Sequence, residues 1–488
     1  MIPVLLIAIP LLSGIVSFFL KREGVARIWA LLSSLATLTT SVLGLTCFST
    51  KESLYAHAEW LPLLGSSFSV GLDGMGQVLG LLTALSFSVI FIATYRSVYT
   101  KAHNFFALML LSQAGLMGVF VAFDALLFYF FWELALIPVY FLCSQWGGER
   151  RIQVTIKFFI YTFIGSLLML IGLIYVHFKT PDQSFALESF YNVVLTNSEQ
   201  SWLFWLLFIA FAIKMPVFPF HTWQPDTYEQ SNTAVTMVLS GIMVKMGIFG
   251  LLRWLAPVLP IATWAWGDTI STLCVIGMIY ASLVAMKQDD LKRLIAYSSI
   301  VHVGLMCLAI FATNEMAIQG AIIQMFNHGV NIIGLWIVVE LIERQFGTRK
   351  ISELGGLAQK APAMAVLLVI LSLANVALPI TNSFVGEFLM FSGVFNSTVS
   401  HYNIIFAVLA LVTIILSAVY TLNMIQRVFL GNTNTLTERA KDIFVNEKLV
   451  LWALVAIIIF LGVYPKPLLE VSQSTVDAIL TRMISKHP

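Results

Sequence analysis

The sequence predicts an all-α polytopic membrane protein with about fourteen transmembrane helices. Of its 488 residues, 59% are apolar and only 11% are charged, whereas soluble proteins average about 45–50% apolar residues. The mean hydropathy is +0.90, and apolar runs long enough to span a bilayer recur along the whole chain. These observations exclude a soluble fold. The net charge of +2, without any basic cluster, gives no indication of nucleic-acid binding.

The apolar runs, taken in order, predict fourteen spans. Their approximate bounds are 2–20, 26–48, 74–98, 103–122, 124–143, 155–177, 202–222, 233–256, 263–286, 293–312, 316–342, 361–397, 402–428 and 447–465. The first run has no positively charged segment before it, so we expect a spanning helix there and not a signal peptide. The seventh and twelfth runs contain prolines and are expected to be broken.

Lysine and arginine residues test the topology of these spans. If the first span starts outside the cytoplasm, 19 of the 27 lysines and arginines fall in cytoplasmic connections and 6 on the opposite side; Lys214 and Lys245 fall within spans. Cytoplasmic loops of membrane proteins carry an excess of positive charge. The bias therefore predicts fourteen helices with both termini outside the cytoplasm.

The two proline breaks occur at corresponding positions of a predicted repeat. Pro216 breaks the seventh span and Pro379 breaks the twelfth, 163 residues later. Five-helix units would place the breaks at matching positions, and an odd number of helices inverts the second unit relative to the first. The sequence thus predicts two inverted repeats, each a half-channel, and four segments: a three-helix segment (1–100), a first repeat (101–260), a second repeat (261–432) and a C-terminal helix with its tail (433–488).

Lys214 lies directly before the first break. The local sequence is Phe211-Ala-Ile-Lys-Met-Pro-Val-Phe-Pro-Phe-His-Thr-Trp-Gln-Pro-Asp226. A lysine ammonium at membrane depth costs a few kcal/mol or more, so it must face a polar interior or lose its proton. The prolines also free backbone carbonyls that need polar partners. Because membrane proteins build ion sites from broken helices with such groups, the stretch predicts an ion site.

Several further ionisable side chains fall within apolar runs: Glu133, Lys245, His302, His328 and Glu387. Such groups are rare inside membranes and usually functional. The alternative for Glu133 is a protonated carboxyl bonded to a neighbouring helix, and for Lys245 a snorkelling side chain. His302 could equally be a packing residue.

His328 belongs to a polar stripe at helical spacing with Gln324 and Asn331. Three polar side chains on one face need partners or water, so packing explains them less well than function. By contrast, Asp73, Asp226 and Glu229 lie near span ends, where we expect solvated loop carboxylates.

The sequence contains no nucleophile arrangement, metal cage or phosphate-binding loop. Its four cysteines lie far apart in apolar runs, with no metal-ligand spacing. The buried charges therefore predict a chain that moves protons, with any redox chemistry located elsewhere.

Four blocks of the sequence resemble the antiporter-like subunits of respiratory complex I, the NADH-quinone oxidoreductase. They are Lys214-Met-Pro-Val-Phe-Pro-Phe-His-Thr-Trp223, Gln288-Asp-Asp-Leu-Lys-Arg-Leu-Ile-Ala-Tyr-Ser-Ser-Ile-Val-His302, Asn327-His-Gly329 and Phe384-Val-Gly-Glu-Phe388. The likeness extends over nearly the whole chain. This family also includes subunits of multisubunit cation/proton antiporters and membrane-bound hydrogenases. Glu387 stands where most relatives carry lysine, and in this the chain is similar to the M-type subunits.

The resemblance implies a role for each buried charge. Glu133 and Lys214 would form a coupled pair, so that moving the glutamate away lets the lysine release its proton. Lys245 would be the central relay, and the two histidines would form the polar axis that connects it onward. Glu387 would be the terminal proton site of the second half-channel.

The resemblance also implies a subunit of a proton-translocating enzyme complex with no cofactor in this chain. NADH, FMN, iron–sulfur clusters and quinone are expected on other subunits. The expected partners are the other membrane subunits, including neighbouring antiporter-like ones, and the lipid bilayer. The expected location is the bacterial inner membrane, with both termini periplasmic. A cation/proton antiporter subunit and a purely structural membrane spacer are the alternatives.

Overall fold

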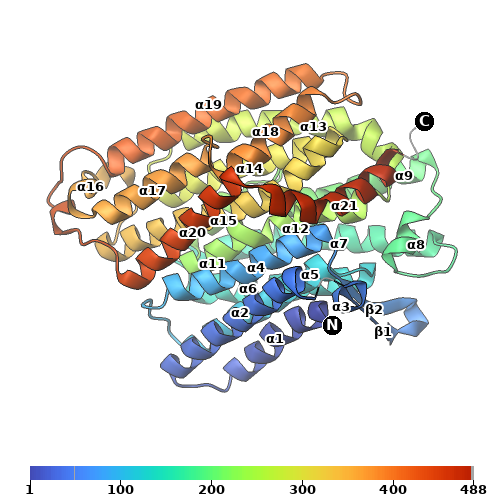
Figure 1. Cartoon of the computed structure of the whole chain (residues 1–488), viewed down its shortest axis with the longest axis horizontal. Helices are drawn as coiled ribbons and strands as arrows, with labels where there is room; N and C mark the ends of the chain where they lie inside the picture. The colour runs from blue at the N-terminus through green and yellow to red at the C-terminus, as the bar shows by residue number, and fades with distance from the viewer. Residues whose placement is uncertain (49, 485–488) are drawn as a thin grey trace.

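The N-terminal segment contains three helices of the bundle and a short turn of helix. The computed structural model describes residues 1–48 and 50–484 and is mostly helical (Figure 1). The segment comprises α1 (Ile2–Ser17), α2 (Glu23–Thr46), α3 (Lys51–Leu54) and α4 (Gly74–Ala93). Asp73 caps α4 by accepting a hydrogen bond from the backbone N–H of Gly76, which supplies one of the partners that a helix start lacks.

A β-hairpin between α3 and α4 shows that the all-α prediction was wrong in this segment. β1 (Tyr55–Leu61) pairs antiparallel with β2 (Ser66–Gly71) around the 3₁₀ turn η1 (Pro62–Leu64). Gly65 closes the turn with φ of 67°, a conformation that favours glycine. Strands of six or seven residues carry a two-residue period, which a search for apolar runs of about 20 residues does not detect.

The first predicted repeat contains a helix that breaks where expected. Its elements are α5 (Ala102–Val121), α6 (Ala125–Trp146), α7 (Arg151–Lys179), α8 (Leu187–Tyr191), α9 (Asn197–Lys214), α10 (Trp223–Gln230), α11 (Thr233–Val238), η2 (Leu239–Met243), α12 (Lys245–Gly250) and η3 (Leu251–Leu255). The predicted break near Pro216 is confirmed, because α9 ends at Lys214 and α10 begins at Trp223. The last four elements form one continuous helical rod in which η2 and η3 are π-helical turns.

The second predicted repeat also contains its expected break. Its elements are α13 (Pro260–Ala285), α14 (Leu291–Phe311), α15 (Glu315–Phe346), η4 (Ile351–Glu353), α16 (Leu357–Lys360), α17 (Pro362–Asn375), α18 (Asn382–Phe395) and α19 (Asn403–Val428). The chain is not helical between α17 and α18, around Pro379. The chain then continues through η5 (Thr437–Arg439) and α20 (Val445–Val463) to α21 (Lys466–Ile484), so the predicted tail is a helix.

Eleven helices of the described chain are long and apolar enough to cross a membrane. They are α2, α4, α5, α6, α7, the rod from α11 to η3, α13, α14, α15, α19 and α20. Two shorter apolar helices, α1 and α17, add to them. The breaks account for the shortness of α17 and α18, at 14 residues each. The structure is thus that of a polytopic helical membrane protein.

Three of these helices form the centre of the bundle. The most apolar stretches of the rod Thr233–Leu255, of α14 and of α15 are buried along their whole length, whereas those of α2, α7, α19 and α20 are only 33–39% buried. The centre packs tightly because a side chain on Gly241 would meet Ile333 and one on Gly329 would meet the carbonyl of Gly241. The three helices carry Lys245, His302 and His328, so the fold places these residues deepest.

Both described chain ends lie near the same end of the bundle. The N-terminal ammonium donates to the carbonyl of Ser53, next to the hairpin, and Arg482 near the end of α21 pairs with Glu188 on α8. In Figure 1 the hairpin and α8 lie toward the right, and α21 crosses the front of the bundle. Helix α21 packs on α15 and α4.

Candidate functional site

Lys214 ends α9 in an aromatic, fully enclosed environment. Its side chain is 2% exposed, and the ammonium nitrogen lies 5.5 Å from the ring centroid of Trp132 and 6.0 Å from that of Phe158. The next turn of helix cannot form, because Pro216 has no N–H. The indole of Trp223 instead donates to the carbonyl of Ile213 at 2.9 Å, which satisfies one of the carbonyls at the broken end.

Glu133 on α6 forms no salt bridge with Lys214 among the described residues. Neither the Lys214 ammonium nor the buried Oε1 of Glu133 has a hydrogen-bond partner there. The two groups that the sequence predicts as a pair are therefore separated in this structure. A lysine without a salt-bridge partner at this depth holds its proton only at a high energetic cost.

Lys245 is held by two specific contacts at the middle of the central rod. Its side chain is fully buried. The nitrogen donates to the carbonyl of Ser240 at 2.7 Å and lies 2.8 Å from Nδ1 of His328 on α15. The snorkelling alternative is thereby excluded, since the amine points to the centre of the bundle.

The π-helical turn η2 explains why Lys245 can reach these groups. The backbone N–H of Val244 bonds to the carbonyl of Leu239, five residues earlier, instead of four as in an α-helix. Such turns are frequent at functional sites because they re-aim side chains. Ser240 and Gly241, which favour helix irregularity, were the only signal for this turn in the sequence.

His302 on α14 and Glu387 on α18 form a second buried contact. Nδ1 of His302 lies 3.0 Å from Oε1 of Glu387, and both side chains are at most 6% exposed. The amide of Gln324 donates to the same carboxylate oxygen at 3.4 Å. The packing alternative for His302 does not account for this polar contact.

The two histidine rings join these contacts into one row. Their centroids lie 5.4 Å apart, and the Nε2 of each ring is buried without a hydrogen-bond partner in the described chain. The row therefore runs from the amine on the central rod, through the two imidazoles, to the carboxylate after the second break. Amine, imidazole and carboxylate can all gain and lose a proton, and water can bridge unpaired nitrogens of this kind.

Polar side chains of α15 form hydrogen bonds with the chain on both sides of the second break. Asn327 donates to the carbonyl of Asn382 at 2.8 Å, and Asn331 donates to the hydroxyl of Ser383 at 2.8 Å. Asn331 also reaches the carbonyl of Ala374 at 3.3 Å, near the end of α17. These contacts confirm that the stripe has polar partners, and they fix α18 so that Glu387 faces the row.

Other buried polar groups lie on α10, beside Trp223, and on α5. Both side-chain polar atoms of Gln113 and Gln224 and the hydroxyl of Tyr228 are unpaired among the described residues. Buried polar atoms in proteins nearly always bond to protein or to ordered water. No hydrogen bond among the described residues connects Lys214 directly to Lys245.

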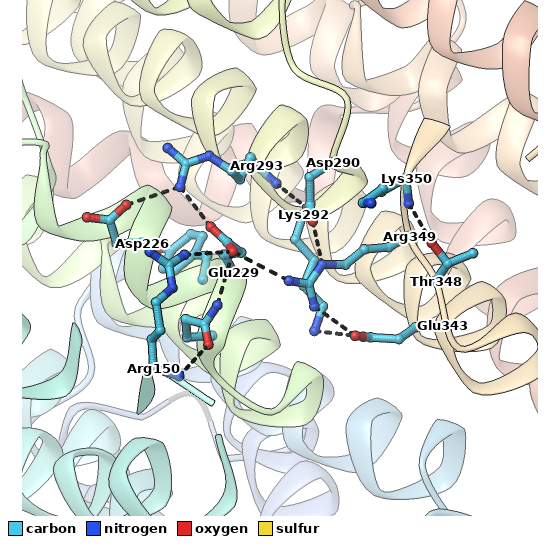
Figure 2. Close-up of polar contacts among 12 residues, drawn as sticks. Arg150, Asp226, Glu229, Asp290, Lys292, Arg293, Glu343, Thr348, Arg349 and Lys350 are labelled. Atoms are coloured by element: carbon cyan, nitrogen blue, oxygen red, sulfur yellow. Dashed lines mark hydrogen bonds and ion pairs between the residues drawn. The ribbon is translucent and has the colours of Figure 1, made fainter. Parts of the chain in front are cut away.

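Sequence reasoning missed an ion-pair cluster at one end of the bundle (Figure 2). Its members are Arg150, Asp226, Glu229, Asp290, Lys292, Arg293, Glu343 and Arg349. Arg293 lies 2.8 Å from Glu229 and 3.1 Å from Asp226, which joins α10 to α14. The prediction that these two carboxylates lie in loops was wrong, because both belong to α10, where arginines from distant segments pair with them; Asp226 is 31% exposed and Glu229 13%.

A cavity of about 820 Å³ adjoins the ion-pair cluster and is lined by Arg150, Glu229, Lys292 and Arg349 among others. The third supposed loop carboxylate, Asp73, is also paired, at 2.8 Å with the buried Arg253 on η3. Charged residues thus occupy both ends of the central rod, with Lys245 between them.

Comparisons with known proteins agree with this geometry. The family model of the NADH:quinone oxidoreductase/Mrp antiporter transmembrane region matches residues 122–417. NADH-quinone oxidoreductase subunit M of Rickettsia typhi is 37% identical over 93% of this chain and 92% of its own. F(420)H(2) dehydrogenase subunit M of Methanosarcina mazei is 32% identical over 99% of both chains.

A solved structure has the same fold over the whole chain. A chain of respiratory complex I from Thermus thermophilus with bound NADH covers 98% of this chain with a TM-score of 0.89 and 27% identity, and all of that chain is matched. The chain belongs to the NADH:quinone oxidoreductase/Mrp antiporter family of membrane subunits, among the M subunits of NADH-quinone oxidoreductase.

Proposed function

We propose that this chain is the proton-translocating membrane subunit of an NADH-quinone oxidoreductase. The observation that carries the proposal is the row of titratable groups from Lys245 through His328 and His302 to Glu387. The amine of Lys245 lies 2.8 Å from Nδ1 of His328, the two imidazole centroids lie 5.4 Å apart, and Nδ1 of His302 lies 3.0 Å from the carboxylate of Glu387. Buried ionic groups add little stability on their own. A chain of four of them at membrane depth is therefore best explained by proton movement.

Each residue of the row has its own role in proton transfer. The amine of Lys245 and the ring of His328 share one hydrogen bond, so a proton passes between them without leaving the protein interior. The imidazole of His302 can take up a proton on Nε2 while it donates to Glu387 through Nδ1. Glu387 then holds the proton at the far end of the row.

Glu133 and Lys214 act as the switch that loads the row. When the carboxylate approaches the ammonium, the pair keeps its proton; when they separate, burial favours release from the lysine. The structure has the two groups apart, which corresponds to the state that releases the proton. The unpaired buried side chains of Gln113, Gln224 and Tyr228 would bind the water that carries this proton toward Lys245.

The proposal includes the topology inferred from the sequence. Fourteen spans arise when the broken pairs α9–α10 and α17–α18 are each counted as one span together with α1 and the eleven long helices. The two five-helix units are then inverted half-channels, with both termini on the periplasmic side of a bacterial inner membrane. The excess of lysine and arginine in the predicted cytoplasmic connections supports this orientation.

The redox cofactors are proposed to lie on other subunits. NADH, FMN, iron–sulfur clusters and quinone would supply the driving force there, and this chain would respond through its contacts with neighbouring membrane subunits.

The test is proton translocation by the reconstituted holoenzyme carrying Lys214→Ala. We expect quinone-dependent proton uptake into proteoliposomes to be lost while electron transfer from NADH to an artificial acceptor continues, because that activity does not use this chain. Unchanged uptake would contradict the proposed switch. Because the artificial-acceptor activity does not use this chain, assembly is checked by the amount of this chain in the purified holoenzyme, which we expect to be equal for Lys214→Ala, Lys214→Arg and the wild type.

A cation/proton antiporter subunit is the second candidate, favoured by the antiporter part of the family description. Glu387 argues against it, because an acidic residue stands at the position where most of the family carries lysine. Sodium-dependent growth of an antiporter-deficient host that expresses the chain with its neighbouring genes would favour this candidate.

A further inference from the structure

A water-sized cavity adjoins the Glu387 end of the row. It has a volume of about 10 Å³ and lies among α13, α14, α18 and α19, and a space of about this size holds one water molecule. His302, Glu387, Thr413 and Ser417 supply its polar lining. The lining residue His302 carries a buried Nε2 that has no hydrogen-bond partner among the described residues.

A second cavity of the same size lies between the same four helices, nearer to the end at which α21 terminates. Its polar lining comes from Ser271, Ser397, Ser400 and Asn403. On α13 it begins at Ser271, seven residues before Met278 of the first cavity, which corresponds to roughly 10 Å along the helix.

An apolar layer separates the two cavities. Leu305 and Phe391 line the first cavity, and Leu308 and Val394 line the second, one helical turn farther on. All four side chains are at most 8% exposed. A constriction of this kind can block water and ions by dewetting while it remains narrow.

Asp268 stands at the outer mouth of the second cavity. It precedes Ser271 by three residues on α13, so the two lie on one face. Its carboxylate accepts a hydrogen bond from the Ser400 hydroxyl at 2.6 Å and lies 3.3 Å from Nδ1 of His401. The side chain of Asp268 is 29% exposed and that of His401 is 87% exposed, so the pair connects the cavity to solution.

We propose that Asp268 is the proton-release residue of this subunit and that the apolar layer of Leu305, Leu308, Phe391 and Val394 is the gate before it. The inference rests on the proposed proton-translocating function. The O–H bond of protonated Glu387 breaks, water in the two cavities relays the proton across the opened gate, and a new O–H bond forms on the Asp268 carboxylate. Asp268 then passes the proton to bulk water, and no group is oxidised or reduced.

The first test compares charge removal at two carboxylates in the reconstituted holoenzyme. Asp268→Asn keeps the size of the side chain and an acceptor for Ser400 but cannot take up a proton. We expect it to lose most of the proton translocation that Glu387→Gln loses, and Asp268→Glu to restore it. The matched control is Asp182→Asn, because Asp182 also accepts a short serine hydrogen bond, from Ser189 at 2.6 Å, but lies away from the cavities.

The second test fills the outer cavity without changing a charge. Ser271→Leu occupies the cavity, whereas Thr272→Leu, one residue along α13, places the same side chain on the exposed face. We expect Ser271→Leu alone to reduce translocation, with equal amounts of the two variant chains in the purified holoenzyme reporting equal assembly.

The outcomes separate the release route from the function on which it rests. Wild-type translocation in both Asp268→Asn and Ser271→Leu, together with a loss in Glu387→Gln, would overturn the release route and leave the proposed function intact. Wild-type translocation in Glu387→Gln would overturn both.

Discussion

The amine of Lys245 and Nδ1 of His328 lie 2.8 Å apart across the interface of the central rod and α15. Within the described chain neither residue forms a salt bridge, and both side chains are at most 1% exposed. Because Nδ1 accepts the bond when the amine donates, a change of protonation on one group is felt directly by the other.

Removing either member of this contact should impair translocation to a similar extent. We expect Lys245→Met, which keeps the apolar stem, and His328→Gln, which keeps a polar side chain, each to reduce proton translocation severalfold in proteoliposomes. Because both act on one transfer step, the double variant should be no worse than the worse single variant. Additive losses would show that the two residues serve separate routes.

The sequence was sufficient to predict the parts of the site that depend on local rules. Prolines in apolar runs located both breaks, and the apolar runs predicted that Lys245, His302, His328 and Glu387 are buried, as they are. The polar stripe of α15 followed from helical spacing alone. Each of these features depends on residues that are close together in the chain, so it can be predicted from a single sequence.

The features that sequence reasoning missed depend on contacts between distant segments. The π-turn at η2 arises where the rod packs against α15, and nothing local to Lys245 requires it. The ion-pair cluster joins Glu229 to Arg293 and Arg349, 64 and 120 residues away in the chain. Glu133 and Lys214 were expected to form a pair, and their separation depends on helix positions that spacing cannot determine.

Glu387→Gln should separate the role of the carboxylate in proton transfer from its role in packing. Glutamine keeps the shape and can still accept from Nδ1–H of His302, so we expect normal assembly and a similar melting temperature of the complex. It cannot carry a proton, so translocation should fall. A parallel fall in melting temperature and activity would instead indicate a structural role, and Asn396→Asp, at the exposed end of α18, controls for charge changes on the same helix.

Gly247→Ala should disturb the contact between α12 and the broken end of α9. An added Cβ would lie 2.6 Å from the carbonyl oxygen of Phe211 and 2.8 Å from Cβ of Met215, next to Lys214. Overpacking of this kind costs about 1–3 kcal/mol, so we expect a lower melting temperature and weaker translocation. Gly24→Ala is the matched control, because its Cβ would meet nothing within 4 Å; an equal loss there would refute the packing argument.

Glu229→Gln should destabilise the contact between α10 and α14. Glu229 is 13% exposed on its side chain and pairs with Arg150 at 3.0 Å, Arg293 at 2.8 Å and Arg349 at 3.7 Å. Without the Glu229 charge, three guanidinium groups lose an anionic partner, which lowers the free energy of unfolding by about 1–3 kcal/mol. We expect the melting temperature of the complex to fall.

The matched control for this change is Glu353→Gln. Glu353 pairs only with Lys350 and Thr348 among the described residues, and both carboxylate and amine of the ion pair are well exposed, at 45% and 61%. Exposed pairs contribute about 0–1 kcal/mol, so this variant should melt like the wild type. If the two variants behave alike, the cluster around Glu229 is an ordinary surface network and does not hold α10 against α14.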